Sequence, residues 1–295
     1  MAAACIGCLR RSGLLKAGVV GAGLMGAEIA LVFALSGHRV ALHDRSEEAL
    51  ARAIARLRGV LDKGVARGAY AGAAADDALT RIVPVTSLDA MRDCAIVTEA
   101  VYEALEAKAD VLRGLDQICA PSCIFATNTS TLPISTLAAF LTPERRGRFI
   151  GTHYFSPVSR MQLVEVISGF ATGKAVADEV VSLMTDIGKR PVRVRDVAGF
   201  AVNRMLHALL IEAVKLVEEG VATPADLDMA CRLGLGHPIG PFAMMDIVTS
   251  DLCLQVQGIL HDAYGERFRP PALLKRRVAA GLGGGKGRTG WIDTE

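Results

Sequence analysis

The chain has 295 residues, of which 51% are hydrophobic and 5% aromatic, and its 33 basic and 31 acidic residues leave a net charge of +2. This composition predicts a well-buried protein of one large domain or two, rich in Ala, Leu and Val. A net charge near zero gives no sign of nucleic-acid binding. No apolar run reaches the roughly eighteen residues that a membrane span needs, so we expect no membrane segment.

Seven cysteines are scattered along the chain, and this odd number suits a reducing compartment better than a disulfide framework. Cys5 and Cys8 form a C-x-x-C pair, but no second pair or histidine cluster supports a metal site, and we expect no metal. The first fifteen residues are basic and lack acids, which is a feature of transit peptides. The segment is short and has one serine, so we favour a bacterial, cytoplasmic protein over one of the mitochondrial matrix.

A short apolar strand is predicted at the start of the chain, followed by G-A-G-L-M-G at residues 21–26 and then by an apolar helix. In such a loop the first glycine permits a tight turn and the second lets the backbone approach a pyrophosphate. The third lets the helix pack on the strand, with its N-terminus towards the phosphates. The predicted cofactor contacts of this loop are Gly21, Gly23, Leu24, Met25 and Gly26.

The next predicted strand, residues 39–43, ends at Asp44, eighteen residues beyond Gly26. An acid at this position can bind the adenosine ribose hydroxyls of a dinucleotide. Because it also repels a 2′-phosphate, the sequence favours NAD over NADP, although Arg45 directly follows. Asp44 is alternatively a helix N-cap, a role that Ser46 could equally fill, and the two roles of Asp44 are compatible.

A hydroxyl, an imidazole and a carboxylate follow on successive predicted elements. Ser130 comes just after an apolar strand-like run, His153 after a second, and Glu165 lies inside a third. Strand ends are where an open α/β sheet places its chemistry, and a buried carboxylate needs a cationic or hydrogen-bonding partner. We predict that Glu165 orients His153 as a general base that takes a proton from a hydroxyl. The alternative is a core histidine with satisfied hydrogen bonds.

Several motifs around these residues resemble those of the L-3-hydroxyacyl-CoA dehydrogenases of fatty-acid β-oxidation. They are N-T-S-T-L at 128–132, G-T-H-Y-F-S-P-V at 151–158, M-Q-L-V-E-V-I at 161–167 and G-F-A-V-N-R at 199–204. The resemblance runs from about Lys16 to the C-terminus. It implies an active site made of Ser130, His153, Glu165 and Asn203.

The resemblance also implies further contacts with NAD. Glu103 and Lys108, in E-A-V-Y-E-A-L-E-A-K at 99–108, correspond to residues that touch the nicotinamide half, and Asn128 is a further predicted contact. Lys286, in the glycine-punctuated tail, corresponds to a lysine that approaches the cofactor. As an ordinary helical pair, Glu103 and Lys108 would be five residues apart, a poor spacing for a salt bridge.

A basic stripe marks the predicted helix at residues 46–67. Its residues share one face at spacings of four, seven and four, and such a stripe is usually a solvated surface. They are Arg52, Arg56, Lys63 and Arg67. The resemblance places the CoA-binding region here, with Arg67 at a common lysine position, so Arg67 and Ser130 are the predicted contacts with the acyl-CoA. Val60 replaces a common serine contact.

Two other positions depart from the family pattern. Ala198 stands where a proline is usual, before the G-F of the next motif, and Ser156 stands where many members have asparagine. The first concerns the bend into the second domain, and the second still offers a hydroxyl. The chain has no hydratase-like segment, which indicates a stand-alone dehydrogenase.

Alternating strand patterns are missing from Gly199 onwards, where a long apolar helix is predicted. The predicted fold is therefore α/β, with an N-terminal Rossmann-type doubly wound sheet and an all-α C-terminal domain. Residues 1–197 would bind NAD and carry catalytic residues. Residues 198–295 would contribute to substrate binding and pair with a second copy in a homodimer.

The resemblance implies NAD-dependent oxidation of an L-3-hydroxyacyl-CoA to the 3-ketoacyl-CoA, or the reverse. One alternative is a β-hydroxyacid dehydrogenase for a small free acid, but those enzymes typically use a catalytic lysine, and His153 argues against this. Another is a catalytically silent NAD-binding protein of the same fold, against which the intact Ser130, His153, Glu165 and Asn203 argue. The sequence does not reveal acyl-chain length, physiological direction or pathway.

Overall fold

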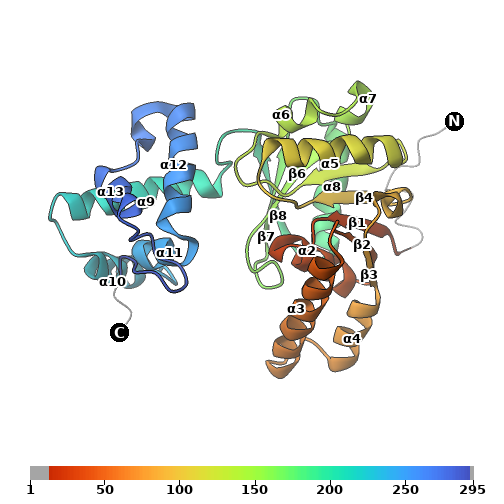
Figure 1. Cartoon of the computed structure of the whole chain (residues 1–295), viewed down its shortest axis with the longest axis horizontal. Helices are drawn as coiled ribbons and strands as arrows, with labels where there is room; N and C mark the ends of the chain where they lie inside the picture. Colours follow the sequence, from red (N-terminus) through yellow and green to blue (C-terminus); the bar gives the residue numbers. More distant parts are fainter. Residues whose placement is uncertain (1–12, 293–295) are drawn as a thin grey trace. The chain divides into compact units, whose positions relative to one another are not determined.

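The chain forms two compact units, Met1–Asp196 and Val197–Glu295, in a computed structural model that describes residues 13–292 (Figure 1). The C-x-x-C pair of Cys5 and Cys8 and most of the basic N-terminal segment lie outside the described residues. Within residues 13–292, no helix has the length and apolar character to cross a membrane.

The N-terminal unit is built on one eight-stranded sheet with the order β3-β2-β1-β4-β5-β6-β7-β8. The strands are β1 (Lys16–Val20), β2 (Arg39–His43), β3 (Ile82–Val85), β4 (Ile96–Glu99), β5 (Ile124–Thr127), β6 (Phe149–Tyr154), β7 (Leu163–Ser168) and β8 (Arg190–Arg195). Neighbouring strands are parallel except for β6 and β7, which run antiparallel. This arrangement confirms the predicted Rossmann-type α/β fold.

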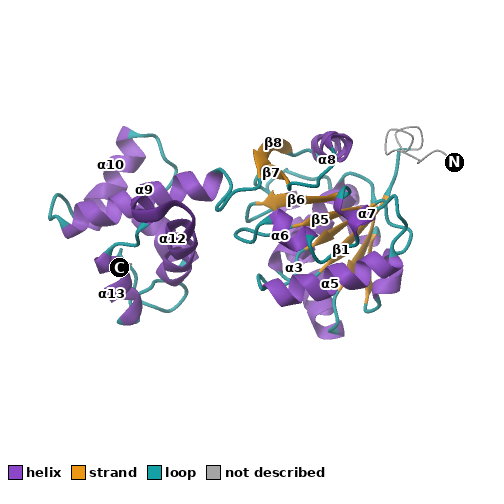
Figure 2. Ribbon diagram, turned by 90° about the horizontal axis from the view of Figure 1, so that it is seen from above, coloured by secondary structure: helices purple, strands orange, loops and turns teal. Residues whose placement is uncertain are grey.

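Helices cover both faces of this sheet, and Figure 2 shows α8 and α5 on opposite faces. The helical segments are α2 (Leu24–Leu35), α3 (Glu47–Ala66), α4 (Gly72–Thr80), η1 (Leu88–Met91), α5 (Leu105–Ile118), α6 (Ile134–Ala138), α7 (Pro143–Arg146) and α8 (Lys174–Asp186). The inner strands are apolar runs rather than alternating patterns because both of their faces are buried. The edge strand β8, in contrast, has arginine at three of its six positions and no buried residue.

Helix α2 lies at the centre of the main core cluster, which joins residues of β1, β2, α3 and α8. All of its twelve residues except Glu28 are apolar or glycine, and Ile29, Leu31 and Phe33 are fully buried. A helix that is apolar on all sides can be stable only between other layers. The core therefore fixes α2, and with it the glycine-rich loop that precedes it.

The described part of the C-terminal unit is entirely helical. Its segments are α9 (Val202–Glu218), α10 (Pro224–Gly234), α11 (Pro241–Val248), α12 (Ser250–Tyr264), η2 (Gly265–Phe268) and α13 (Ala272–Ala279). A core of Leu210, Val214, Phe242 and Trp291 joins α9, α11 and the C-terminal tail. The predicted helix start at Gly199 is wrong, since Gly199 and Phe200 have φ values of +69° and +45° and α9 begins at Val202.

Candidate active site

The glycine-rich loop joins β1 to α2 and packs against the start of the β4–α5 connection. Gly21 has a φ of +106°, and a Cβ at this residue would lie 2.6 Å from the carbonyl oxygen of Ala100. A Cβ on Gly26 would lie 1.9 Å from the carbonyl oxygen of Gly21. Gly23 instead faces open space and forms the N-cap of α2 without a capping side chain. The first N–H groups of α2 are therefore suited to bind phosphate.

Asp44 follows β2 and contacts the same loop. Its Oδ2 accepts a hydrogen bond of 2.9 Å from the N–H of Ala22, and its Oδ1 accepts one of 3.1 Å from the N–H of Ser46. The N-cap of α3 is Ser46, whose hydroxyl accepts from the N–H of Ala49. Ser46, and not Asp44, therefore caps α3. Each carboxylate oxygen of Asp44 keeps a lone pair for a further donor.

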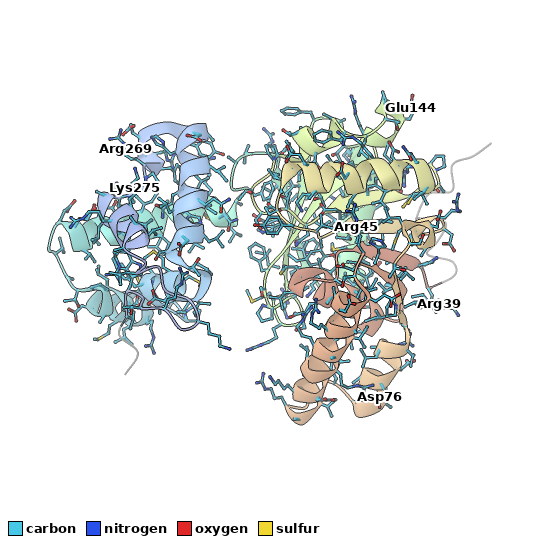
Figure 3. All side chains as sticks on the ribbon, viewed as in Figure 1. Arg39, Arg45, Asp76, Glu144, Arg269 and Lys275 are labelled. Carbon is cyan, nitrogen blue, oxygen red and sulfur yellow. The ribbon has the colours of Figure 1, made fainter. Side chains whose placement is uncertain are left out.

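A cavity of about 640 Å³ lies between the glycine-rich loop and the β4–α5 connection. Gly21, Gly23, Leu24, Met25 and Asp44 line it, together with Arg45 (labelled in Figure 3), and residues such as Tyr102 and Val111 form the opposite wall. The cavity opens at the carboxyl ends of β1, β2 and β4, where the strand order reverses. A glycine cradle at a helix N-terminus beside a carboxylate fits the pyrophosphate and ribose of a dinucleotide.

Ser130, His153 and Glu165 form a continuous hydrogen-bonded chain. The Oγ of Ser130 is 3.1 Å from Nε2 of His153, and Nδ1 of His153 is 2.7 Å from Oε2 of Glu165. His153 and Glu165 are 4% and 1% exposed, so water screens their interaction little. The ring of Phe155 packs against the imidazole with 4.6 Å between centroids. This arrangement joins a hydroxyl, an imidazole and a carboxylate.

The position of His153 differs from the expected strand end. His153 lies inside β6, and the antiparallel register with β7 places it directly opposite Glu165. Residues opposite each other across a strand pair project to the same face of the sheet, so the backbone pairing itself brings the two side chains together. Ser130 does follow a strand end, since β5 ends at Thr127.

Glu103 holds the segment that carries Ser130. Its Oε1 accepts hydrogen bonds from the N–H groups of Ser130 and Thr131, at 2.8 and 3.0 Å, and from the hydroxyls of Thr129 and Thr131. Burial alone would raise the pKa of Glu103, but the charge of Lys108 and these hydrogen bonds outweigh it, so the pKa is lowered. Glu103 is therefore an ionised anchor beside the candidate base.

Lys108 is fully buried and bound to two carboxylates. Its Nζ lies 3.0 Å from Glu99 and 3.2 Å from Glu103. The expectation that Glu103 and Lys108 are too poorly spaced to pair is wrong, because Glu103 precedes α5 and no helical spacing separates them. With its ammonium enclosed in this way, Lys108 supports Glu103 rather than lining the cavity.

Asn128 connects the serine segment to the histidine strand. Its Oδ1 accepts a 3.0 Å hydrogen bond from the N–H of Tyr154, and its own N–H donates to the carbonyl oxygen of Glu99. Both contacts hold the end of β5 between β4 and β6. The predicted cofactor contact of Asn128 would add to this structural role.

The basic stripe on α3 is not uniform. Arg56 turns inward and donates to the carbonyl oxygens of Ala22 and Gly23, so it supports the glycine-rich loop. Arg52, Lys63 and Arg67 are exposed, and Arg67 forms the C-cap of the helix. Val60 packs against the main core cluster. The exposed basic stripe is thus smaller than the spacing alone suggests.

Two predicted site residues belong to the C-terminal unit. Asn203 is half-buried in the first turn of α9. Lys286 is exposed between Gly285 and Gly287, which have φ values of +88° and +76°. The tail around Lys286 is fixed by Asp246, whose carboxylate accepts from the N–H groups of Trp291 and Ile292.

Glu99 and Thr127 belong to the site but were not identified from the sequence. The Oε2 of Glu99 accepts a 2.7 Å hydrogen bond from the hydroxyl of Thr127, and both residues are fully buried. A signal was present, because each is the last residue of an apolar strand, the same position that indicated Ser130.

Two family models match this chain. The model of the 3-hydroxyacyl-CoA dehydrogenase NAD-binding domain matches residues 16–197, and that of the 3-hydroxyacyl-CoA dehydrogenase C-terminal domain matches residues 199–294. Together they span nearly the whole chain. The fold and the matched domain define an NAD-dependent dehydrogenase, so the predicted cofactor, NAD, is confirmed.

Individual relatives are similar over their whole length. The chain is 40% identical to a probable 3-hydroxybutyryl-CoA dehydrogenase of Deinococcus radiodurans, over 94% of this chain and 99% of the relative. It is 36% identical to the 3-hydroxybutyryl-CoA dehydrogenase of Clostridioides difficile, over 95% and 99%. The crystal structure of (S)-3-hydroxybutyryl-CoA dehydrogenase from Ralstonia eutropha superposes with a TM-score of 0.91 at 36% identity, covering 95% and 99%. The chain belongs to the 3-hydroxyacyl-CoA dehydrogenase family.

Proposed function

We propose that the chain oxidises the 3-hydroxyl of an L-3-hydroxyacyl-CoA to a ketone, or catalyses the reverse reduction, with His153 as the general base. The observation that carries this proposal is the chain from Ser130 through His153 to Glu165, at 3.1 and 2.7 Å. It supplies a base and its orienting acid next to a dinucleotide cavity. The names of the relatives support a 3-hydroxyacyl-CoA thioester as the substrate class.

The proton is handled by His153. With a proton on Nδ1 donated to Glu165, the imidazole carries its lone pair on Nε2, which can accept the proton of the substrate hydroxyl. The carboxylate of Glu165 then stabilises the imidazolium that forms. Ser130 orients the substrate oxygen towards Nε2, and Asn203 is proposed as a second hydrogen-bond partner of the substrate. NAD, when bound, supplies the acceptor for the hydride from C3.

The cofactor is proposed to contact a defined set of residues. They are Gly21, Gly23, Leu24, Met25, Gly26, Asp44, Glu103, Asn128 and Lys286. Glu103 keeps one carboxylate oxygen, Oε2, for contacts beyond the serine segment, and this oxygen also pairs with Lys108. Exposed Arg67 is proposed to bind a phosphate of CoA.

The substrate class can be tested by following NADH consumption with acetoacetyl-CoA, longer 3-ketoacyl-CoAs and small free keto acids. Turnover of the thioesters, and not of the acids, supports the proposal. Turnover of the acids alone would indicate a β-hydroxyacid dehydrogenase instead. NADH binding without turnover of any of them would indicate a catalytically silent protein.

We further propose a homodimer formed through the C-terminal unit. Large apolar side chains are exposed along α10 to α12, among them Met229, Leu233, Leu235 and Ile247. Exposed apolar surface of this kind is typical of a protein interface. Sedimentation equilibrium tests the proposal, since Leu233→Glu should shift a dimer towards monomer, and a monomeric wild-type protein would contradict it.

A bacterial cytoplasmic location is proposed as well. Five free cysteines occur among the described residues, and four of them are buried. Free thiols suit a reducing compartment. The relatives from Deinococcus radiodurans and Clostridioides difficile are bacterial, which supports the proposal, and fractionation of the source cells would test it.

A further inference from the structure

Glu99 is a charged residue with no exposed surface at the carboxyl end of β4. Its Oε1 accepts from the N–H of Val101 at 2.6 Å, and its Oε2 accepts from the hydroxyl of Thr127 at 2.7 Å. Both oxygens also accept from Nζ of Lys108, at 3.0 and 3.1 Å. All of these partners are donors, so the site is built for a carboxylate rather than for an amide.

These contacts join three segments of the chain. Val101 lies in the connection that carries Glu103, Thr127 ends the strand before Ser130, and Lys108 lies in the first turn of α5. The main-chain oxygen of Glu99 also accepts from the N–H of Asn128 at 2.8 Å. Glu103 binds the serine segment. Glu99 therefore holds both partners of this contact, the connection that carries Glu103 and the strand end that precedes Ser130.

The positive charge of Lys108 is shared between two carboxylates. The ammonium lies between the carboxylates of Glu99 and Glu103, and Glu103 turns its other oxygen to the backbone N–H groups of Ser130 and Thr131. Removing one partner of a buried ion pair is costly, because the remaining charge is left uncompensated. A change at Glu99 is thus transmitted through Lys108 and Glu103 to the backbone of Ser130.

We propose that Glu99 is a positioning residue for the reaction, which through Lys108, Glu103 and Thr127 holds Ser130 at hydrogen-bond distance from His153. This role rests on the proposed function of the Ser130, His153 and Glu165 chain. Glu99 acts through the backbone of the serine segment. Small displacements of a substrate-orienting group are sufficient to slow catalysis strongly.

The test is amide hydrogen exchange of the full-length protein combined with steady-state kinetics. In Glu99→Gln, an amide nitrogen must face at least one of three donors, so the exchange of Ser130 and Thr131 should become about 10-fold faster. The kcat for acetoacetyl-CoA should fall by about 10- to 100-fold because Ser130 is displaced. Exchange in β6 around His153 should stay as in the wild type.

Two further variants separate positioning from stability. Thr127→Val removes one hydrogen bond of Glu99 and keeps a β-branched residue in the strand, so it should fold and change exchange and kcat in the same direction by a smaller factor. Arg145→Met is the control. It removes a buried guanidinium that binds the carbonyl oxygens of Cys119 and Cys123, at the opposite end of β5, and should lower Tm without changing exchange at Ser130.

Unchanged exchange at Ser130 and Thr131 in both Glu99→Gln and Thr127→Val would overturn the proposal, whatever the loss of Tm. So would a normal kcat together with faster exchange. Failure of the proposed function is recognised separately, because then the wild-type protein does not turn over any 3-ketoacyl-CoA. The exchange measurement still reports on the Glu99 contacts in that case.

Discussion

His153 and Glu165 face each other across two antiparallel strands, with Nδ1 of the imidazole 2.7 Å from Oε2 of the carboxylate. Their separation is set by the register of β6 and β7, so neither side chain depends on a loop for its position. Both are buried, and the orienting hydrogen bond is therefore protected from competition with water. As the proposed base, His153 therefore requires no rearrangement before it accepts a proton.

Replacing the base should separate catalysis from cofactor binding. His153→Ala should lower kcat by about 10²- to 10⁴-fold, the usual contribution of a general base. The affinity for NADH should hardly change, since His153 does not line the dinucleotide cavity. Stopped-flow turnover and fluorescence titration with NADH measure the two quantities. Loss of NADH binding would instead indicate a structural role for His153.

Glu165 should contribute to turnover through its pair with His153. Glu165→Gln removes the negative charge that stabilises the imidazolium, so kcat should fall while the fold is kept. Thr152→Val is a matched control from the neighbouring position of β6, because successive residues of a strand point to opposite faces and Thr152 is also fully buried. Its kcat should remain that of the wild type. Wild-type turnover in Glu165→Gln would remove the pair from the mechanism.

Cofactor preference should depend on Asp44. The wild-type enzyme should use NADH better than NADPH, because the carboxylate accepts from ribose hydroxyls and repels a 2′-phosphate. Asp44→Ala should reduce this preference by roughly 10- to 150-fold, the value of one hydrogen bond to a charged group, chiefly by weakening NADH. The ratio of kcat/KM for the two cofactors measures it. Equal use of both by the wild type would mean that Arg45 dominates the site.

Stability of the C-terminal unit should depend on pH through His207. Burial lowers the pKa of His207 to about 4 from an ordinary value of 6.5. Above pH 6.5 the residue is neutral in the folded and unfolded states. Between pH 6.5 and 4 only the unfolded state binds the proton, so the free energy of unfolding should fall by about 1.4 kcal/mol per pH unit.

Urea unfolding followed by the fluorescence of Trp291 measures this dependence, since the single tryptophan lies in the core of the same unit. His207→Gln should remove this part of the slope between pH 6.5 and 4. An identical slope in the variant would show that His207 titrates alike in both states.

Local patterns were enough to predict β1, β2 and the glycine-rich loop. The apolar runs at 16–20 and 39–43 end at polar or glycine residues, and both strands have these bounds in the structure. Gly21 is favoured by its φ of +106°, and Gly26 is required because a Cβ there would lie 1.9 Å from the carbonyl oxygen of Gly21, so both constraints act within a few residues of the chain. Signals of this kind need no knowledge of distant partners.

The antiparallel pairing of β6 and β7 could not be predicted in the same way. The register that brings His153 opposite Glu165 is a long-range property of the sheet, and a slip of one residue would turn every side chain to the other face. The burial of Lys108 was missed for a related reason. A lysine is buried only where carboxylates meet it, and its partner Glu99 comes from a different element.

A substitution in the exposed part of the basic stripe tests whether the enzyme acts on CoA thioesters or on free acids. A hydrogen bond to a charged group is worth about 1.5–3 kcal/mol, less on a salt-screened surface, so Arg67→Glu should raise KM for acetoacetyl-CoA severalfold. The effect should weaken as salt is added. Initial rates of NADH oxidation at several salt concentrations measure it. Some loss of kcat is consistent, because remote binding also orients the reacting end.

A truncated pantetheine thioester and a second charge reversal provide the controls for Arg67→Glu. The truncated substrate lacks the CoA phosphates, so its KM should hardly change. Arg39→Glu makes the same charge change on an exposed residue at the amino end of β2, away from the cavity (Figure 3), and should leave both substrates unaffected. Equal losses for both thioesters in Arg67→Glu would mean that the substitution disturbs the fold. No loss for either would show that Arg67 is part of an ordinary solvated face, because a residue that binds a phosphate cannot reverse its charge without a change in KM.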